Sequence, residues 1–257
     1  MATLSNIEMH YRGEEEFVKR MMDICENVER KQSFYVTEFL NPYQIEIVES
    51  VGNSYDDLKV ETYGGIVNCE MARAIIAPEY FEIEKDDFKV GVYEIIYPTK
   101  FEKVKHSDVL GALTHLGIKR ELFGDIVVNE RVFFACDSTL EYLLQDEMTS
   151  VRHARIRIKK TEEEIEAHQE YTVKTFFVSS LRLDVLLSHF YKVSRSEVNK
   201  FIIAGFVKVN HKVIVENSFL CNNNDIISFK KHGRVKVVDT NRISKGNNHV
   251  IEGYFYK

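Results

Sequence analysis

Three short stretches near the C-terminus decide the fold: residues 181–187 read LRLDVLL, residues 194–196 read SRS, and residues 201–210 read FIIAGFVKVN. In the first stretch the leucines recur at helical spacing, which predicts an amphipathic helix. Ser194 is a favoured N-cap residue, and Glu197 stands three positions later, as in a capping box. The pattern therefore predicts a second helix soon after the first.

A small antiparallel sheet is expected to follow these two helices. Gly205 is suited to end the second helix, and Asn210-His211 is suited to the two-residue turn of a hairpin. Strands are predicted at Phe206–Val209, Lys212–Val215 and Asp225–Phe229, with a further candidate strand at Arg234–Val238. Two helices on a small sheet bury a small core, so we expect a compact module.

The polar residues of this module are mostly basic: Arg182, Arg195, Lys200, Lys208 and Lys212, together with Asn210 at the turn. Arg182 and Arg195 stand near helix starts, where a cation is mildly unfavourable, so we expect them to serve a ligand. Guanidinium groups and helix N-terminal amides together suit phosphate. The alternative interpretation is a solvated positive face without a ligand.

Charge is divided unevenly along the chain. Residues 176–257 hold 13 Lys and Arg against 6 Asp and Glu, a net charge of +7, whereas residues 1–175 hold 21 against 34, a net charge of −13. The whole chain of 257 residues carries −6. A basic module on an acidic body is typical of a protein that binds a polyanion through one of its domains.

The first part of the acidic body, residues 1–80, predicts a small α+β domain. Helices are expected at Glu14–Lys31 and Asn41–Val51, and strands at Ser33–Leu40, Leu58–Tyr63 and Asn68–Ile76. Asn41 is suited to cap the second helix, and Pro42 fits its first turn.

The second part, residues 81–160, predicts the order β-α-β-β-α-β of a ferredoxin-like, RRM-like plait. The expected elements are a strand at Val90–Tyr97, a helix capped by Ser107, two strands at Asp125–Val128 and Arg131–Cys136, a helix opened by Ser138, and a strand at Ala154–Ile158. RNA-recognition versions of this plait carry stacking aromatics on their two central strands. Here Tyr93 or Tyr97 and Phe133 or Phe134 are the candidates. The alternative is that Phe133 or Phe134 lies in the core, because one of two neighbouring strand residues must face inward.

Two further segments complete the predicted organisation, which is α+β with three small domains. Residues 161–176 begin with a run of glutamates and are expected to form a solvated linker or spacer helix. Residues 177–240 form the basic module, and residues 241–257 are expected to form a C-terminal tail.

Residues 178–238 resemble the S4 (αL-type) RNA-binding domain found in ribosomal protein S4, some pseudouridine synthases, tyrosyl-tRNA synthetases and heat-shock ribosome factors. The matching elements are R-L-D at 182–184, S-R at 194–195, I-x-x-G-x-V-x-V-N at 202–210 and D-I-I at 225–227. The RNA contacts that this resemblance implies are Arg182, Ser194, Arg195, Lys208, Asn210 and Lys212, with Lys200, Lys230, Lys231 and Arg234 as looser additions.

The whole chain also resembles the YlmH-like proteins of Gram-positive bacteria and their relatives. The matching stretches are TEFLNP at 37–42, LGAL at 110–113, LGIKRE at 116–121, FGDI at 123–126, VSSLRLD at 178–184 and GRVKV at 233–237. The resemblance implies a ribosome-associated factor that binds rRNA or tRNA on the large ribosomal subunit carrying peptidyl-tRNA, in quality control of stalled translation. Val235 stands where that family usually has Phe, and Asn241–Lys257 fits its pattern loosely.

Catalysis is the alternative class of function. Pseudouridine synthases also carry Arg-Leu-Asp, but a Thr/Ser-x-Gly-Leu follows there, whereas Val185–Ser188 continues a helix, so Asp184 is expected to be structural. We find no Gly-rich cofactor loop, nucleotide-binding motif or HExxH. An RNA-modifying enzyme would instead need an active site in the acidic body, around Lys119, Arg120 and Asp125. A concave pocket with convergent polar groups in the two N-terminal regions would favour that alternative.

The remaining sequence features exclude several classes. No apolar run is long enough to span a membrane, and the first residues lack the pattern of a signal peptide. The four cysteines form no CxxC pair, so we expect buried, reduced thiols: Cys25, Cys69, Cys136 and Cys221. We therefore expect a cytoplasmic monomer that binds RNA, without a catalytic residue, metal or cofactor, and without membrane or DNA as partners.

Overall fold

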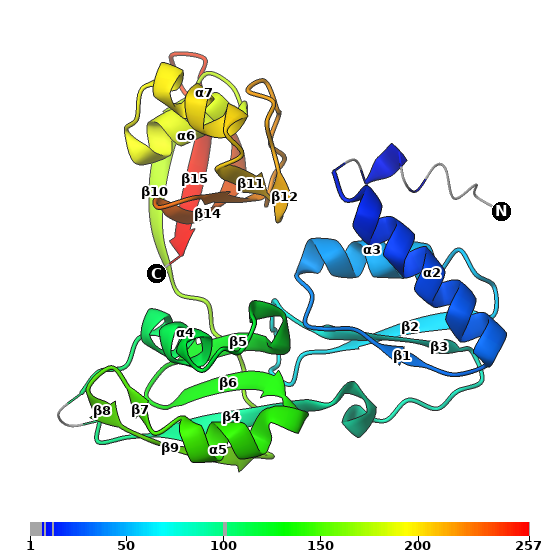
Figure 1. Cartoon of the computed structure of the whole chain (residues 1–257). Helices are drawn as coiled ribbons and strands as arrows, with labels where there is room; N and C mark the ends of the chain where they lie inside the picture. Colours follow the sequence, from blue (N-terminus) through cyan, green and yellow to red (C-terminus); the bar gives the residue numbers. More distant parts are fainter. Residues whose placement is uncertain (1–6, 8, 12, 100–101, 257) are drawn as a thin grey trace. The chain divides into compact units, whose positions relative to one another are not determined.

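The computed structural model describes residues 7, 9–11, 13–99 and 102–256 of the chain. These residues form two compact units, Met1–His168 and Gln169–Lys257, which are called unit 1 and unit 2 below. Unit 1 contains two α+β domains and unit 2 contains one (Figure 1).

The first domain of unit 1 consists of α2 (Glu15–Lys31), β1 (Tyr35–Val36), α3 (Pro42–Gly52), β2 (Leu58–Tyr63) and β3 (Arg73–Pro78). Its antiparallel sheet has the order β1-β3-β2. The predicted start of α3 is confirmed, because Asn41 and Gln44 form a capping box and Pro42 occupies the first turn. The strand predicted at Ser33–Leu40 is shorter than expected.

The second domain of unit 1 consists of η1 (Lys85–Phe88), β4 (Val90–Ile96), α4 (His106–His115), η2 (Arg120–Leu122), β5 (Phe123–Val128), β6 (Val132–Asp137), η3 (Ser138–Leu140), α5 (Glu141–Glu147), β7 (Ser150–Val151), β8 (Ala154–Arg155) and β9 (Arg157–Thr161). Its four-stranded antiparallel sheet has the order β5-β6-β4-β9. The order strand, helix, two strands, helix, strand is as predicted, with the small β7–β8 pair inserted before the last strand.

Two details of this domain differ from the prediction. Lys105, rather than Ser107, occupies the N-cap of α4, and the Asp108 carboxylate accepts the N–H of Lys105 at 3.0 Å. Asp137 caps the turn before α5 by accepting the N–H of Thr139 at 2.9 Å. A carboxylate can accept backbone N–H groups at the start of a helix, as a serine hydroxyl can. Ser107 and Ser138 therefore predict the two starts at nearly the correct positions, although neither serine is the N-cap residue.

Both faces of the four-stranded sheet are covered. Tyr93 and Phe134 are fully buried in the core that α4 and α5 share with the sheet. Phe133 lies on the opposite face, where it is buried together with Phe39 of the first domain and Ile165. The core interpretation of Phe133 and Phe134 is therefore confirmed, and Tyr93 is buried as well. Tyr97 is half-buried and packs against the same core as Tyr93.

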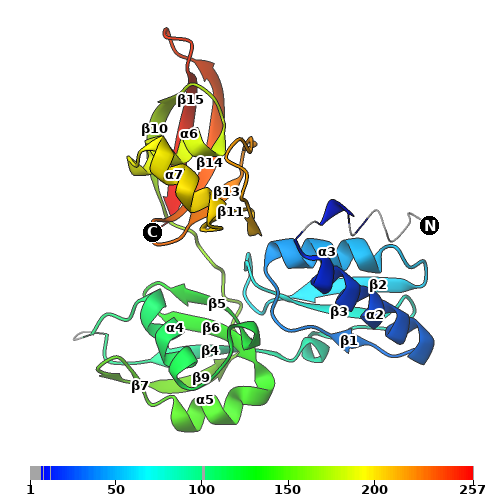
Figure 2. The ribbon, with the colours of Figure 1, turned by 45° about the horizontal axis from the view of Figure 1, so that its top comes forward.

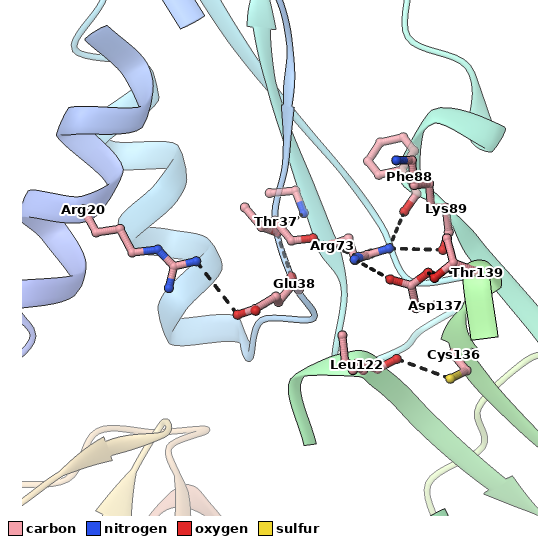
Figure 3. A network of polar contacts seen from close by, with 11 residues as sticks. Arg20, Thr37, Glu38, Arg73, Phe88, Lys89, Leu122, Cys136, Asp137 and Thr139 are labelled. Atoms are coloured by element: carbon pink, nitrogen blue, oxygen red, sulfur yellow. Dashed lines mark hydrogen bonds and ion pairs between the residues drawn. The ribbon is translucent and has the colours of Figure 1, made fainter. Parts of the chain in front are cut away.

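A buried polar network joins the two domains of unit 1 (Figure 3). The guanidinium of Arg73, at the start of β3, donates to the Asp137 carboxylate at 2.9 Å and to the carbonyl oxygens of Thr37 at 2.8 Å and Phe88 at 3.1 Å. Arg73 and Asp137 are 6% and 8% exposed. Burial raises the pKa of Asp137, but hydrogen bonds from Thr139 and Arg73 outweigh burial, so the net pKa of Asp137 is lowered.

Unit 2 consists of β10 (Tyr171–Val178), α6 (Leu183–Tyr191), α7 (Arg195–Ile203), β11 (Val207–Val209), β12 (Lys212–Val213), β13 (Ile226–Phe229), β14 (Gly233–Ile243) and β15 (His249–Tyr256). Its antiparallel sheet has the order β10-β15-β14-β13-β11-β12. Both helices lie on the same face of the sheet (Figure 2). The shared core includes Leu183 and Leu186 of α6, Ile202 of α7, and Ile227 and Val235 of the sheet.

At the borders of unit 2, the spacer-helix alternative for residues 161–176 and the predicted C-terminal tail are wrong, whereas residues 162–164 and 168–170 are exposed, as expected of a solvated linker. Residues 162–170 form no helix: Ile165 is buried, and Glu166 forms a β-bridge with Val67. Residues 241–257 are no free tail, because they include β15, which pairs with both β10 and β14. The glutamate run resembles a helix locally, and long-range strand pairing overrides that local preference.

All four cysteines are free thiols; Cys25, Cys136 and Cys221 are buried and Cys69 is half-buried. Burial raises the pKa of Cys25 to about 12. Within the described residues, no helix is long and apolar enough to cross a membrane. The same residues contain no group of three or more His, Cys, Asp or Glu side chains arranged to hold a metal ion.

Candidate nucleic-acid interface

A buried carboxylate organises the basic residues at the two helix starts of unit 2. Asp184, in the first turn of α6, is 1% exposed. It accepts hydrogen bonds from Arg182 Nε at 3.1 Å and from a terminal nitrogen of Arg195. Arg182 is the N-cap residue of α6, and Arg195 is the first residue of α7. One carboxylate therefore brings together two guanidinium groups from two different helices. We call these three residues the arginine clamp.

The clamp leaves the guanidinium groups accessible. The side chains of Arg182 and Arg195 are 40% and 54% exposed, although the carboxylate between them is not. Burial raises the pKa of Asp184, but the hydrogen bonds from Arg195 and Arg182 outweigh burial, and the net pKa is lowered. Asp184 is therefore ionised at neutral pH. The two guanidinium groups and the one carboxylate together carry a net charge of +1. The N–H groups that do not bond to Asp184 can donate to a phosphate or to another planar acceptor such as a carboxylate.

Ser194 lies immediately before Arg195 and starts α7 as predicted. Its hydroxyl accepts the N–H of Glu197 at 3.3 Å, and the residue is exposed. Lys200 is also exposed, on the side of α7 that faces away from the core. Five residues along a helix correspond to a rotation of roughly 140°, so Lys200 does not join the clamp.

The hairpin β11–β12 separates its two lysines. Lys208 lies between the buried residues Val207 and Val209, so its side chain lies on the sheet face opposite α6 and α7. Lys212 lies opposite Val209 in the register and is half-buried on the helix side. The sequence leads us to expect one RNA face that carries Arg182, Arg195, Lys208, Asn210 and Lys212. The structure does not bring Lys208 and the arginine clamp onto one face.

Both polar atoms of the Asn210 side chain hold the β11–β12 hairpin in place. Its side-chain nitrogen donates to Asp225 at 2.8 Å, and its side-chain oxygen accepts the N–H of Ile226 at 2.8 Å. Asn210 and His211 both have positive φ, 46° and 69°, as a two-residue turn of type I′ requires. Asn210 thus fixes the position of Lys212 relative to β13.

The last three predicted contacts lie around the β13–β14 turn. The Lys230 ammonium lies 4.8 Å from the Phe206 ring centroid, and Lys231 is exposed with φ of 69°. Arg234 lies on β14, and its guanidinium carbon is 4.5 Å from the Tyr256 ring centroid. Arg234 shares the helix-free face of the sheet with Lys208, because both lie opposite Ser228 in the register.

Sequence reasoning missed the organising role of Asp184. The motif was visible as Arg-Leu-Asp, in which Arg182 and Asp184 are two residues apart. The sequence does not predict that Arg195, eleven residues after Asp184, donates to the same carboxylate. That approach depends on the packing of α7 against α6.

The kind of pocket that would favour an active site in the acidic body is present, because the larger hollow of unit 1 is lined by charged side chains that include Glu46, Lys85 and Lys160. The candidate residues Lys119, Arg120 and Asp125 do not line it. Asp125 accepts the backbone N–H groups of Glu70 at 2.6 Å and Met71 at 3.0 Å, so its carboxylate holds a loop. Unit 1 has a hollow of about 700 Å³ and another of about 260 Å³, and Asp125 lines neither. Arg120 lines the smaller hollow.

Comparison with known proteins agrees with this architecture. Residues 181–227 match the S4 domain, residues 84–165 match the family described as a putative RNA-binding domain in YlmH, and residues 13–81 match the N-terminal domain of YlmH. The fold and the basic site thus define an S4-type RNA-binding protein.

One curated relative and one solved structure are similar to this chain. The chain is 30% identical over 237 residues to the ribosome-associated protein quality control protein P2 of Bacillus subtilis (strain 168). The aligned region covers 90% of this chain and 91% of that protein. A solved structure, the cell division protein ylmH from Streptococcus pneumoniae, matches with a TM-score of 0.52 and 30% identity, over 58% of this chain and 92% of that one. The chain belongs to the YlmH family.

Proposed function

We propose that this protein binds structured RNA of the large ribosomal subunit, rRNA or tRNA, without catalysing a reaction, and that it acts in quality control of stalled translation. The observation that carries the proposal is the arginine clamp, which presents two partly exposed guanidinium groups beside two helix N-termini. Such groups are suited to phosphate oxygens. The name of the Bacillus relative supports the ribosomal context.

The distribution of charge supports the same assignment. Unit 2, residues 169–257, holds 14 Lys and Arg against 7 Asp and Glu, whereas residues 1–168 hold 20 against 33. The positive charge is therefore concentrated in the unit that carries the clamp. An RNA-bound ribosomal factor of this kind would work in the cytoplasm, as a monomer and with no cofactor.

Within unit 2 we assign different roles to the predicted residues. Arg182 and Arg195 contact phosphate directly, and Ser194 and Lys212 lie on the same helix side of the sheet. Asn210 acts by positioning the hairpin. Four further cations contribute longer-range attraction: Lys200, Lys208, Lys230 and Lys231. Arg234 belongs to the opposite face of the sheet.

The geometry of Asp184 argues against the alternative of a pseudouridine-synthase-like enzyme. A catalytic aspartate must reach the substrate, but Asp184 is 1% exposed and is bonded to two arginines. A carboxylate in that position serves the clamp and is not accessible for attack on a base.

The test is a salt titration of RNA binding by the full chain. We expect Arg182→Ala and Arg195→Ala each to weaken binding of a ribosomal RNA hairpin, with little dependence on its sequence. Each should flatten the slope of log affinity against log salt by up to ~1, because each removes one phosphate contact. Arg20→Ala in unit 1 is the control and should change neither quantity. Unchanged affinity in both unit 2 variants would refute the site.

A further inference from the structure

The six-stranded sheet of unit 2 has a second face, turned away from α6 and α7 (Figure 2). Residues that contact the helices, such as Val207, Val235 and Ile251, are buried. Side chains alternate across a strand, so their neighbours point to the other side. The residues of this second face that matter here are Lys208, Arg234, Lys236, Tyr171, Tyr254 and Tyr256. We call them the tyrosine face.

Three tyrosines from the two strands at one edge of the sheet adjoin one another. Tyr171 of β10 lies opposite Tyr256 of β15 in the register. The Tyr171 ring centroid is 5.0 Å from that of Tyr256 and 5.7 Å from that of Tyr254, in edge-to-face geometry. All three are half-buried. Part of each ring is therefore accessible from the solvent side of the sheet.

Cations flank these rings. The guanidinium carbon of Arg234 is 4.5 Å from the Tyr256 ring centroid, and Lys236 lies opposite Tyr254 in the β14–β15 register. Lys208 continues the row across β13. Aromatic side chains that accept bases, combined with cations that follow a phosphate backbone, are the two components of a surface for single-stranded nucleic acid.

Glu252, an acidic side chain on this face, already has partners of its own. Glu252 accepts the hydroxyl of Tyr254 at 3.3 Å and lies 4.0 Å from the Arg242 guanidinium. Its charge is therefore offset locally, and Lys208 and Lys236 give the described part of this face a positive balance. This balance favours a polyanion as occupant. An acidic protein surface would use the cations but leave the tyrosine rings without a partner.

The corresponding surface in unit 1 is closed. On the four-stranded sheet there, Phe133 is buried against Phe39 and Ile165. Tyr93 is fully buried in the core on the other side. The four-stranded sheet of unit 1 and the six-stranded sheet of unit 2 both carry aromatic residues at adjoining positions. Those of unit 1 are buried, whereas Tyr171, Tyr254 and Tyr256 of unit 2 are only half-buried.

We infer that the tyrosine face is a second RNA-binding surface, which takes unpaired nucleotides by stacking their bases on Tyr171, Tyr254 and Tyr256 and by pairing their phosphates with Arg234, Lys236 and Lys208. The inference rests on the proposed RNA binding and extends it. The arginine clamp binds a structured RNA, and the tyrosine face, on the opposite side of the same sheet, binds a single-stranded extension of that RNA.

The test compares two probes on the full chain: an RNA hairpin with blunt ends, and the same hairpin extended by about ten uridines, a length within the usual range of such sites. Wild type is expected to bind the extended hairpin more tightly. The double variant Tyr254→Leu with Tyr256→Leu keeps apolar bulk but lacks the aromatic faces. It should lose most of this gain, a fall of roughly five- to a hundredfold per base that no longer stacks, and should bind the blunt hairpin as wild type does.

Two controls separate stacking from other effects. The pair Tyr254→Phe with Tyr256→Phe retains the rings and should retain the gain. Arg195→Ala should weaken both probes equally, because it acts at the clamp. Ultraviolet cross-linking of the extended RNA followed by peptide mapping should identify the β15 peptide that carries Tyr254 and Tyr256.

Each adverse outcome has a distinct meaning. If the extension brings wild type no gain, or if the leucine pair keeps the gain, the tyrosine face does not bind RNA. If ultraviolet irradiation gives no cross-link between the RNA extension and the β15 peptide, RNA does not contact the tyrosine face and the inference is overturned. If Arg195→Ala leaves hairpin binding intact while the leucine pair loses the gain, the clamp assignment fails and the tyrosine face stands.

Discussion

At the scale of single residues, Asp184 connects the fold of unit 2 to its proposed RNA binding. The carboxylate is buried in α6 and spans Arg182 and Arg195, which belong to different helices. Without it, each arginine would be a long flexible side chain that loses rotamer freedom when it binds phosphate. With it, the guanidinium groups are held before the ligand arrives, so less entropy is lost on binding.

This role gives a prediction in which two physical effects have opposite signs. Asp184→Asn raises the net charge by one, so simple attraction to RNA should increase. We expect the affinity to fall nevertheless, because the two guanidinium groups are released. We also expect the free energy of unfolding to fall by about 1.5–3 kcal/mol, the range for hydrogen bonds to a charged group. Fluorescence anisotropy with a labelled RNA hairpin and urea unfolding measure the two effects.

The matched control for this prediction is Glu216→Gln. Glu216 is exposed, hydrogen-bonded to Ser218, and its removal changes the net charge by the same amount without touching the clamp. It should bind RNA as well as wild type or slightly better. If Asp184→Asn binds as tightly as Glu216→Gln, charge alone accounts for binding and the clamp has no organising role.

Asn210 illustrates a second residue whose role is structural. Its positive φ of 46° and its two side-chain hydrogen bonds fix the β11–β12 turn. Asn210→Gly loses the two side-chain hydrogen bonds but adopts the positive φ without strain. Asn210→Ala loses the same hydrogen bonds and is also strained at that φ. We expect the alanine variant to be less stable than the glycine variant by about 1 kcal/mol, measured by urea unfolding. Equal stability of the two variants would show that the turn relaxes to another conformation.

At the scale of elements, local signals and long-range pairing account for different parts of the fold. The start of α3 at Asn41-Pro42, the end of α7 before Gly205 and the turn at Asn210-His211 were predictable because each depends on neighbouring residues. β10 and β15 were missed because they pair across more than 70 residues of chain. Tyr171 and Tyr256 cannot be recognised as neighbours from their own surroundings in the sequence.

The same division applies to the candidate site. The basic residues were identified from composition and from the resemblance to S4 domains. Their distribution over two faces was not, because the side to which Lys208 points depends on which face of the sheet the helices cover. The covered sheet of unit 1 was likewise not predictable, since Phe133 meets Phe39 and Ile165 only in the folded unit.

The junction inside unit 1 leads to a prediction at this scale. Arg73→Met leaves the buried Asp137 carboxylate without its guanidinium, and we expect unfolding of unit 1 to become easier by about 3–5 kcal/mol. The exposed pair Arg20–Glu38 is the control: its atoms are 3.9 Å apart, and Arg20→Ala should cost about 0–1 kcal/mol. Circular dichroism during urea unfolding measures both. Similar small losses in the two variants would contradict a structural role for the network.

The pH dependence of this junction follows from the lowered pKa of Asp137. A group whose pKa is lower in the folded protein contributes stability above its ordinary pKa and loses it as pH falls through the folded value. Wild type should therefore lose this contribution in acid, below the ordinary aspartate range. Arg73→Met should show a weaker loss over the same interval, because the charge that lowers the pKa has been removed.

At the scale of the whole molecule, the chain divides its charge between its two units. Residues 1–168 hold 33 acidic against 20 basic residues, and residues 169–257 hold 7 against 14. Attraction to RNA is therefore concentrated in unit 2, and unit 1 contributes repulsion from polyanions. We expect this division to orient the protein on a ribosomal surface, with the basic unit toward RNA.

The measurement that tests the central claim most directly is co-sedimentation of the full chain with separated ribosomal subunits at low and high salt. The account predicts that wild type sediments with the large subunit at low salt, that high salt releases it, and that Arg182→Ala with Arg195→Ala is released at low salt while Arg20→Ala is retained. Failure of wild type to sediment with the large subunit at low salt, or equal retention of the double clamp variant, would contradict the account.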